Sequence, residues 1–152
     1  ILTVWLPITN ATEQNGCLEL FPISHKRVLP THCPDAVRGL RIPSRFLPNT
    51  SRLIVPVKQG SVLFMHRKTV HRSLPNRSNG VRWSFDLRYN VIGQPTGRPF
   101  FPGFVVRSQK HTESMLSDSD VWAQLWRDSR DFLANKKDPT YNRWNGDVPA
   151  CA

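Results

Sequence analysis

The sequence predicts a mainly β chain, an antiparallel sandwich or barrel with one helix towards its C-terminal end. Short runs of β-branched and aromatic residues alternate with turn-forming residues, which is typical of antiparallel strands. Residues 81–92 alternate apolar and polar side chains over the length of a long strand. Apolar residues recur near helical spacing in residues 118–135, which indicates a single helix there.

The first strand is expected over residues 1–6, where β-branched and aromatic side chains predominate. Alternation places Ile1, Thr3 and Trp5 on one face of this strand. The polar residues 9–16 end in Asn-Gly, a pair that favours a tight turn. A second short strand is then expected from Cys17 to Phe21.

The long segment 22–52 is basic, rich in proline and without a clear period. It is therefore interpreted as an ordered loop, because loops of this length in a compact domain are usually lids or binding loops. Strands resume at residues 53–57, where Pro56 indicates an edge or a bulge, and at residues 61–65, which follow the turn 58–60.

The longest strand is expected over residues 81–92. If its apolar face packs on the core wall, its polar face lines a polar interior or meets solvent. The apolar face comprises Val81, Trp83, Phe85, Leu87 and Tyr89, and the polar face comprises Arg82, Ser84, Asp86 and Arg88.

Residues 93–152 are expected to extend the β core of residues 1–92. The Gly- and Pro-rich residues 93–110 would wrap the outside of the sheet. The helix over 118–135 has Ser117 or Asp118 as a candidate N-cap, and its apolar stripe is interpreted as structural, docking on the sheet. No chemistry is expected of the tail, residues 141–152.

The chain has 152 residues and a formal net charge of +10, which fits one basic domain. Thirteen Lys or Arg but only two acids lie between Lys26 and Arg88. A basic surface suits nucleic acid, small anions or simply solvation, and composition alone leaves all three open. No apolar run approaches the length needed to cross a bilayer.

The three cysteines are an odd count without Cys-x-x-Cys spacing, so a disulfide framework or zinc ribbon is not expected. A reducing, cytoplasmic compartment is the default, and the location stays open. Three Asn-x-Ser/Thr triplets, at Asn10, Asn49 and Asn76, favour secretion only slightly. The chain opens on Ile1 inside an apolar run, which suggests a fragment of a longer protein.

Residues 60–85 are expected to carry the chemistry. His71 follows an apolar run and a short polar loop separates it from Arg82, which opens the next strand. Histidine is the commonest metal ligand, and the arginine fork is the preferred clamp for a carboxylate. On neighbouring strands the two would hold a metal and an acid that chelates it. The remaining histidines are interpreted as structural or solvated; they are His25, His32, His66 and His111.

Three stretches resemble the phytanoyl-CoA dioxygenase family of iron(II)- and 2-oxoglutarate-dependent oxygenases. They are Val4–Leu18, Phe21–Lys26 with Ser-His-Lys at its end, and Gly60–Arg82 with His71, Ser73 and Asn76. The resemblance runs in order over residues 1–90. It implies a double-stranded β-helix, a cupin-like jelly-roll barrel, of which this chain would form the C-terminal part.

The resemblance also implies a role for each site residue. His71 matches the second histidine of a two-histidine, one-carboxylate iron site, which leaves positions open for 2-oxoglutarate and O2. Arg82 matches the arginine that pairs with the distal carboxylate of 2-oxoglutarate. Ser73 matches a nearby hydroxyl that contacts the same cosubstrate. Trp5 matches a tryptophan that packs against this cosubstrate. Ser84 faces the same side as Arg82 and is a weaker candidate for the same carboxylate.

The sequence departs from the family pattern in two places. The family's His-x-Asp motif precedes the strand that carries Trp5, and the chain begins too late to contain it, so one iron ligand of three is expected here. The triplet His111-Thr-Glu113 lies in the wrong order to replace it. Ile23 stands where the family usually has glycine. Relatives with Gly in place of the aspartate halogenate, but hydroxylation is the more common outcome and is favoured.

The favoured hypothesis is therefore an oxygenase acting on a small organic substrate, an anion or a CoA thioester received by the basic loop 26–52. The alternatives are a non-catalytic jelly-roll scaffold and a nucleic-acid-binding module. The combination of His71, Ser73 and Arg82 argues against a bare scaffold. The acidic, tryptophan-rich helix argues against nucleic acid.

Overall fold

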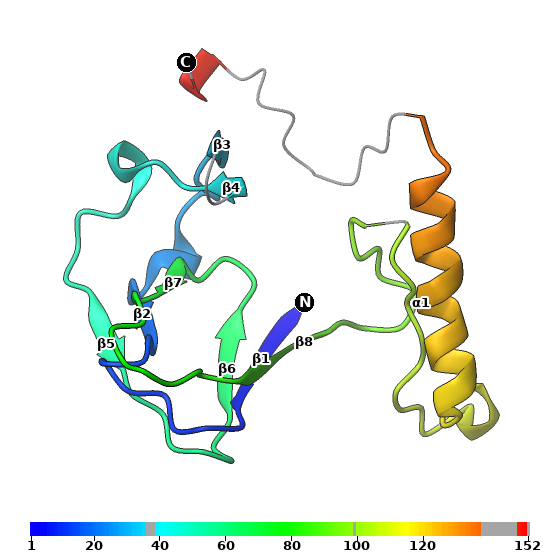
Figure 1. The fold of residues 1–152 in the computed structure, drawn as a ribbon. Coiled ribbons are helices and arrows are strands. Elements are labelled where there is room, and N and C mark those ends of the chain that lie inside the picture. The colour runs from blue at the N-terminus through cyan, green and yellow to red at the C-terminus, as the bar shows by residue number, and fades with distance from the viewer. Residues whose placement is uncertain (36–38, 99, 138–148, 152) are drawn as a thin grey trace. The chain divides into compact units, whose positions relative to one another are not determined.

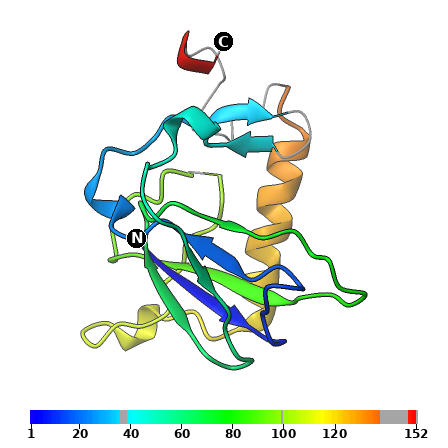
Figure 2. The ribbon, with the colours of Figure 1, turned by 90° about the vertical axis from the view of Figure 1, so that its left-hand side faces the viewer.

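The computed structural model describes residues 1–35, 39–98, 100–137 and 149–151. The chain divides into two compact units. One contains Ile1–Asn90 with the described C-terminal residues, and the other is Val91–Asn145. Figures 1 and 2 show that the first unit carries the strands and the second the long helix.

Two three-stranded antiparallel sheets form the first unit. The first sheet has the order β6-β1-β8 and the second sheet has the order β5-β2-β7. The strands of the first sheet are β1 (Leu2–Pro7), β6 (Leu63–His66) and β8 (Ser84–Tyr89). Those of the second are β2 (Leu18–Leu20), β5 (Leu53–Val55) and β7 (His71–Ser73).

The chain passes repeatedly from one sheet to the other, because β5, β6, β7 and β8 alternate between them. Such alternation is typical of jelly rolls, whose eight strands form two sheets. With three described strands in each sheet the barrel is open and partial (Figure 1). The prediction of a mainly β, partial barrel is confirmed, and β5 lies at a sheet edge as Pro56 indicated.

The core lies between the two sheets. Trp5 and Met65 of the first sheet pack with Leu18 of the second and with Ala11 and Cys17. The face of β1 that carries Thr3 and Trp5 points inward, since each of these residues is only 4% exposed. Side chains with the same parity as Trp5 therefore point towards the interior.

The apolar face predicted for residues 81–92 is the outer one. Trp83 is 62% and Phe85 52% exposed, whereas Arg82 and Ser84 are half-buried. The register explains this difference, because Pro7 pairs with Ser84, so the polar set shares the inward side of β1. The strand is also shorter than predicted, and Arg82 precedes it.

Segment 22–52, interpreted from the sequence as one long ordered loop, also contains short regular elements. It holds a short hairpin of β3 (Cys33–Asp35) and β4 (Gly39–Arg41), and the 3-10 turns η1 (Ser24–Lys26) and η2 (Ser44–Phe46). Three-residue strands that contain proline or glycine carry too weak a pattern to be recognised.

A disulfide fixes the hairpin to the C-terminal residues, contrary to the expectation from the cysteine count. Cys33 pairs with Cys151, 118 positions further along the chain. Arg45 Nη2 donates to the carbonyl of Ala150 at 2.5 Å in the same region. Cys17 is free and buried. Of the predicted tail, residues 141–148 and 152 lie outside the described residues.

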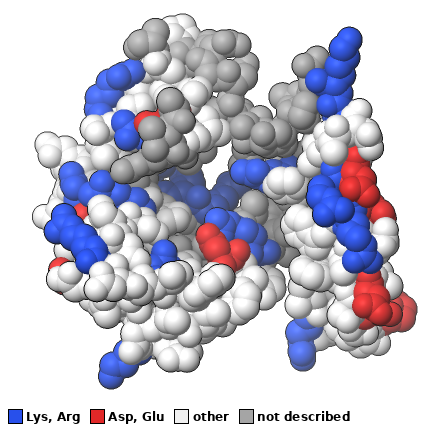
Figure 3. All heavy atoms as spheres, viewed as in Figure 1, with Lys and Arg blue, Asp and Glu red and all other residues white. Residues whose placement is uncertain are grey.

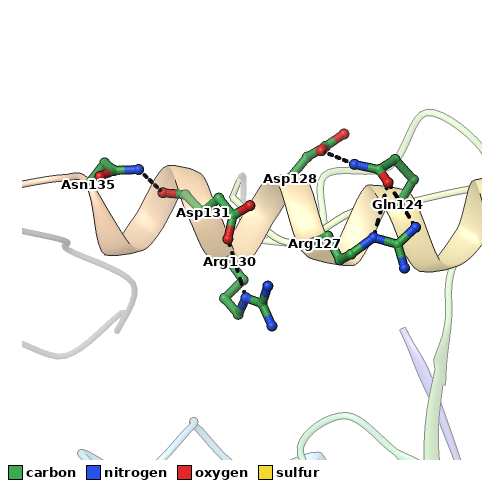
Figure 4. Close-up of polar contacts among 6 residues, drawn as sticks. All are labelled: Gln124, Arg127, Asp128, Arg130, Asp131 and Asn135. Atoms are coloured by element: carbon green, nitrogen blue, oxygen red, sulfur yellow. Dashed lines mark hydrogen bonds and ion pairs between the residues drawn. The ribbon is translucent and has the colours of Figure 1, made fainter.

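The second unit contains α1 (Ser119–Ala134), which confirms the predicted helix. The predicted cap Asp118 accepts hydrogen bonds from the backbone N–H groups of Asp120 and Val121. The helix carries polar pairs along its surface (Figure 4), among them Gln124 donating to Asp128 at 2.6 Å. No helix in the described ranges is long and apolar enough to cross a membrane.

Candidate active site

The short strand β7 carries two of the predicted site residues. Its pairing with β2 sets His71 opposite Leu20 and Ser73 opposite Leu18. Leu18 is 3% exposed and belongs to the core, so this parity faces the barrel interior. His71 and Ser73 thus share the inward face, about 7 Å apart along the strand.

The imidazole of His71 is oriented by its own turn. Its Nδ1 lies 2.8 Å from the carbonyl oxygen of Thr69, and because a carbonyl only accepts, Nδ1 carries the proton. Nε2 then bears the free lone pair, and the ring is exposed. A histidine that ligates a metal usually donates its other N–H to such a partner, so the tautomer is the one a metal requires.

The guanidinium of Arg82 is held by neutral groups. Nη1 donates to Ser84 Oγ at 2.8 Å and Nη2 to Ser73 Oγ at 3.2 Å. Its Cζ lies 5.2 Å from the centroid of the Trp5 ring. No ion pair of the described residues includes this half-buried cation. A cation so positioned favours an incoming carboxylate.

The structure joins four of the five predicted site residues through direct contacts. Arg82 touches Ser73, Ser84 and Trp5, and His71 lies two residues from Ser73 on the same face of β7. His71 therefore shares one face of β7 with Ser73, the residue whose hydroxyl accepts a hydrogen bond from Arg82.

The thiol of Cys17 lies within the electrostatic reach of Arg82. Burial raises the pKa of this thiol and Glu13 adds to the rise, whereas a backbone hydrogen bond at Val55 and, to a smaller extent, the charge of Arg82 oppose it. The net direction keeps Cys17 protonated and inert at neutral pH. The thiol thus serves the core and supplies no charge to the site.

Backbone packing beside Gly16 positions the chain after β7. Gly16 has φ of 90°, and a Cβ there would lie 2.6 Å from the carbonyl oxygen of Leu74. Asn76 then closes the following loop by donating to the carbonyl of Gly80 at 2.7 Å. This loop leads directly to Arg82.

The described residues do not complete a metal site by themselves. They contain no group of three His, Cys, Asp or Glu side chains that could hold an ion. His111 and Glu113 interact with each other at 3.2 Å in the second unit. His71 thus offers one well-oriented nitrogen, and an iron would need further ligands.

The carbonyl of Thr69 and the hydroxyl of Ser24 are supporting groups that sequence reasoning missed. Thr69 sets the tautomer of His71, and Ser24 accepts from the backbone N–H of Val70 at 2.9 Å. Ser24 was visible within the Ser-His-Lys motif, but the backbone partner of His71 leaves no signal in the sequence.

A model of the family described as phytanoyl-CoA dioxygenase (PhyH) matches residues 1–84, more than half of the chain. The chain belongs to the phytanoyl-CoA dioxygenase family. It is 28% identical over 115 residues to the mouse phytanoyl-CoA dioxygenase domain-containing protein 1, covering 68% of this chain and 36% of that protein. The Caenorhabditis elegans homologue is 32% identical over 93 residues, covering 55% and 32%. The chain thus spans about a third of these relatives.

The chain is also similar to two proteins of known structure whose names mention 2-oxoglutarate (alpha ketoglutarate). SnoK, a non-heme alpha ketoglutarate dependent carbocyclase, is 30% identical, covering 55% of this chain and 33% of its own, with a TM-score of 0.44. EvdO2 from Micromonospora carbonacea, complexed with 2-oxoglutarate, is 28% identical, covering 64% and 42%, with a TM-score of 0.46.

Proposed function

We propose that the protein is an Fe(II)- and 2-oxoglutarate-dependent dioxygenase that hydroxylates a small organic substrate. The observation that carries the proposal is the half-buried Arg82. Among the described residues its printed contacts are the neutral Ser73, Ser84 and Trp5, and Ser73 shares one face of β7 with His71, whose Nε2 is free. Membership of the phytanoyl-CoA dioxygenase family supports this assignment.

Arg82 would bind the distal carboxylate of 2-oxoglutarate. The guanidinium retains donor capacity beyond its two serine contacts. The hydroxyls of Ser73 and Ser84 accept from Arg82, so their own hydrogens remain free to donate to the same carboxylate. Trp5 supports the fork from below and excludes water from one side.

His71 would supply one iron ligand through Nε2, with its ring held by Thr69. Iron with 2-oxoglutarate and O2, when bound, supplies the oxidising chemistry. The residues of this chain would bind and orient the diacid, and His71 would hold the iron through one nitrogen. Arg82 acts by clamping and moves no proton, because arginine is a rigid fork of hydrogen-bond donors rather than an acid or base.

The substrate is proposed to be a small anion or a CoA thioester. The basic segment 22–52, which includes the hairpin of β3 and β4, would serve as the binding loop. Support comes from the charge of the region, in which Lys and Arg far outnumber acids. Figure 3 shows more Lys and Arg than Asp and Glu on the viewed face of the strand-bearing unit.

The decisive experiment uses the full-length protein with Fe(II), ascorbate and 2-oxoglutarate, and measures succinate formation together with 2-oxoglutarate binding by calorimetry. Succinate that depends on both iron and 2-oxoglutarate would support the oxygenase. A protein that binds neither would instead be the non-catalytic jelly-roll scaffold.

A further inference from the structure

Two copies of a basic triplet meet in space although they are far apart in the sequence. His25-Lys26-Arg27 covers the end of η1 and its C-cap, and His66-Arg67-Lys68 begins at the last residue of β6 and continues into the following turn. Each triplet begins with a histidine that is followed by two permanent cations. We name these six residues the basic cluster.

Specific contacts hold the two triplets together. The backbone N–H of Phe21 donates to the carbonyl of Val70 at 2.9 Å. The N–H of Val70 donates in turn to the buried hydroxyl of Ser24, also at 2.9 Å. These bonds fix η1 against the turn between β6 and β7. The juxtaposition is therefore built into the fold rather than produced by long side chains alone.

The side chains of the cluster are also in contact. The rings of His25 and His66 have centroids 5.5 Å apart, and Lys68 Nζ donates to the carbonyl oxygen of Arg27 at 3.0 Å. The N–H of Lys68 donates to Nδ1 of His66 at 3.2 Å. Because Nδ1 of His66 accepts, its Nε2 carries the proton and is available to donate to an anion.

No acid neutralises this charge in the described part of the chain. The ion pairs of the first unit involve Asp35, Glu19 and Asp86, and none of their partners belongs to the basic cluster. Desolvation, followed by the charges of His25, Lys68 and Arg67, lowers the pKa of His66. The cations thus repel one another, and a bound anion would relieve that repulsion.

The backbone at this place adopts a rare conformation. Ile23, immediately before η1, has φ of 66° although it is β-branched, and it is 64% exposed. Such a residue in the left-handed region is a steric outlier, and strained residues gather at ligand clamps. Ile23 directly precedes η1, whose His25 ring lies 5.5 Å from that of His66.

We propose that the basic cluster binds a phosphoryl-bearing small molecule, a diphosphate or phosphate monoester. A phosphoryl group offers several anionic oxygens and suits convergent donors from two triplets better than a single carboxylate does. The cluster lies at the His71 end of β7, whereas Arg82 contacts the Ser73 end. The inference rests on the proposed function: the anion bound by the basic cluster would belong to the substrate, because 2-oxoglutarate would bind at Arg82.

The test is a titration with inorganic pyrophosphate, followed by NMR of the five histidine side chains without iron or 2-oxoglutarate. We expect saturable shifts of the His25 and His66 signals and a rise in the pKa of His66. His111, paired with Glu113 in the second unit, is the internal control. Sodium chloride at matched ionic strength separates binding from screening.

The variant Lys26→Ala/Arg67→Ala/Lys68→Ala should weaken pyrophosphate about tenfold or more. Lys110→Ala, a single exposed cation of the second unit, should leave it unchanged. Equal shifts at His111, no saturation, or unaltered binding by the triple variant would overturn the proposal. Because the titration needs no turnover, its failure leaves the oxygenase assignment intact. Intact pyrophosphate binding without succinate formation would remove the oxygenase assignment alone.

Discussion

The guanidinium of Arg82 lies over the indole of Trp5, with its Cζ 5.2 Å from the ring centroid. This contact orients a cation without neutralising it, because the ring offers only its quadrupole. A carboxylate partner from the protein would have satisfied Arg82 and closed the site to a ligand. The combination of Trp5 and two serine hydroxyls instead leaves the charge available.

Replacing Arg82 by alanine should weaken 2-oxoglutarate binding about ten- to a hundredfold. A hydrogen bond to a charged group contributes about 1.5–3 kcal/mol, and each 1.4 kcal/mol is tenfold in affinity. Arg82→Lys keeps the charge but loses the fork, so its affinity should be intermediate. Calorimetry on the full-length protein measures both effects.

Arg77→Ala is the matched control, since Arg77 is exposed on the loop before Arg82. It should bind 2-oxoglutarate like the wild type. If Arg82→Ala also retained wild-type affinity, Arg82 would have no place in the site.

Replacing His71 by alanine should abolish succinate formation while the protein stays folded. Because the ring is exposed, its removal should leave the free energy of unfolding unchanged. Its Nε2 is the proposed iron ligand. His111→Ala, which removes an exposed histidine of the second unit, should leave turnover unchanged. Normal turnover by His71→Ala would refute the role of this residue.

Local patterns predicted the strands because each pattern has a local physical cause. Trp5 and Thr3 alternate with outward residues, so their burial follows from the period of a strand. The inward face of β8 could not be predicted in this way, since Trp83 and Phe85 are large and apolar yet exposed. Only the register with β1 decides which face is inward.

The site was predicted in part for a similar reason. His71, Ser73 and Arg82 stand out by residue type and spacing. Their contacts, however, depend on β7, a strand of three residues that is too short to give a recognisable sequence pattern. The pairing of Cys33 with Cys151 spans 118 positions, and a cysteine count cannot specify such a pair.

Removal of the buried hydroxyl in Ser24→Ala should lower the free energy of unfolding by about 1–3 kcal/mol. The N–H of Val70 would lose its acceptor in a buried setting, and an unsatisfied buried donor costs this amount. Urea denaturation measures the change, with the exposed Ser61→Ala as control. Equal stabilities for the two variants would show that the bond to Val70 contributes nothing.

Substitution of Gly16 by alanine should destabilise the protein more than substitution of Gly60. Both glycines have positive φ, at 90° and 77°, so each variant incurs backbone strain of about 1–2 kcal/mol. A Cβ at Gly16 would also meet the carbonyl oxygen of Leu74 at 2.6 Å, whereas nothing lies within 4 Å at Gly60. Thermal unfolding should therefore rank Gly16→Ala below Gly60→Ala, and the opposite order would exclude the close approach to Leu74.

The native protein should resist alkylation of all three cysteines. Cys33 and Cys151 are paired, and the Cys17 thiol is buried with a raised pKa, so little thiolate forms. Iodoacetamide followed by mass spectrometry should find no modified cysteine in the folded protein. It should find one after denaturation and three after denaturation with reduction.

Cys33→Ser/Cys151→Ser should then unfold more easily, by up to about 5 kcal/mol in the chain-entropy account of a cross-link this distant. Cys17 should stay protected in that variant, because its burial depends on the core around Trp5 and Leu18. Alkylation of Cys33 in the folded wild type would contradict the disulfide, and rapid modification of Cys17 would contradict its burial.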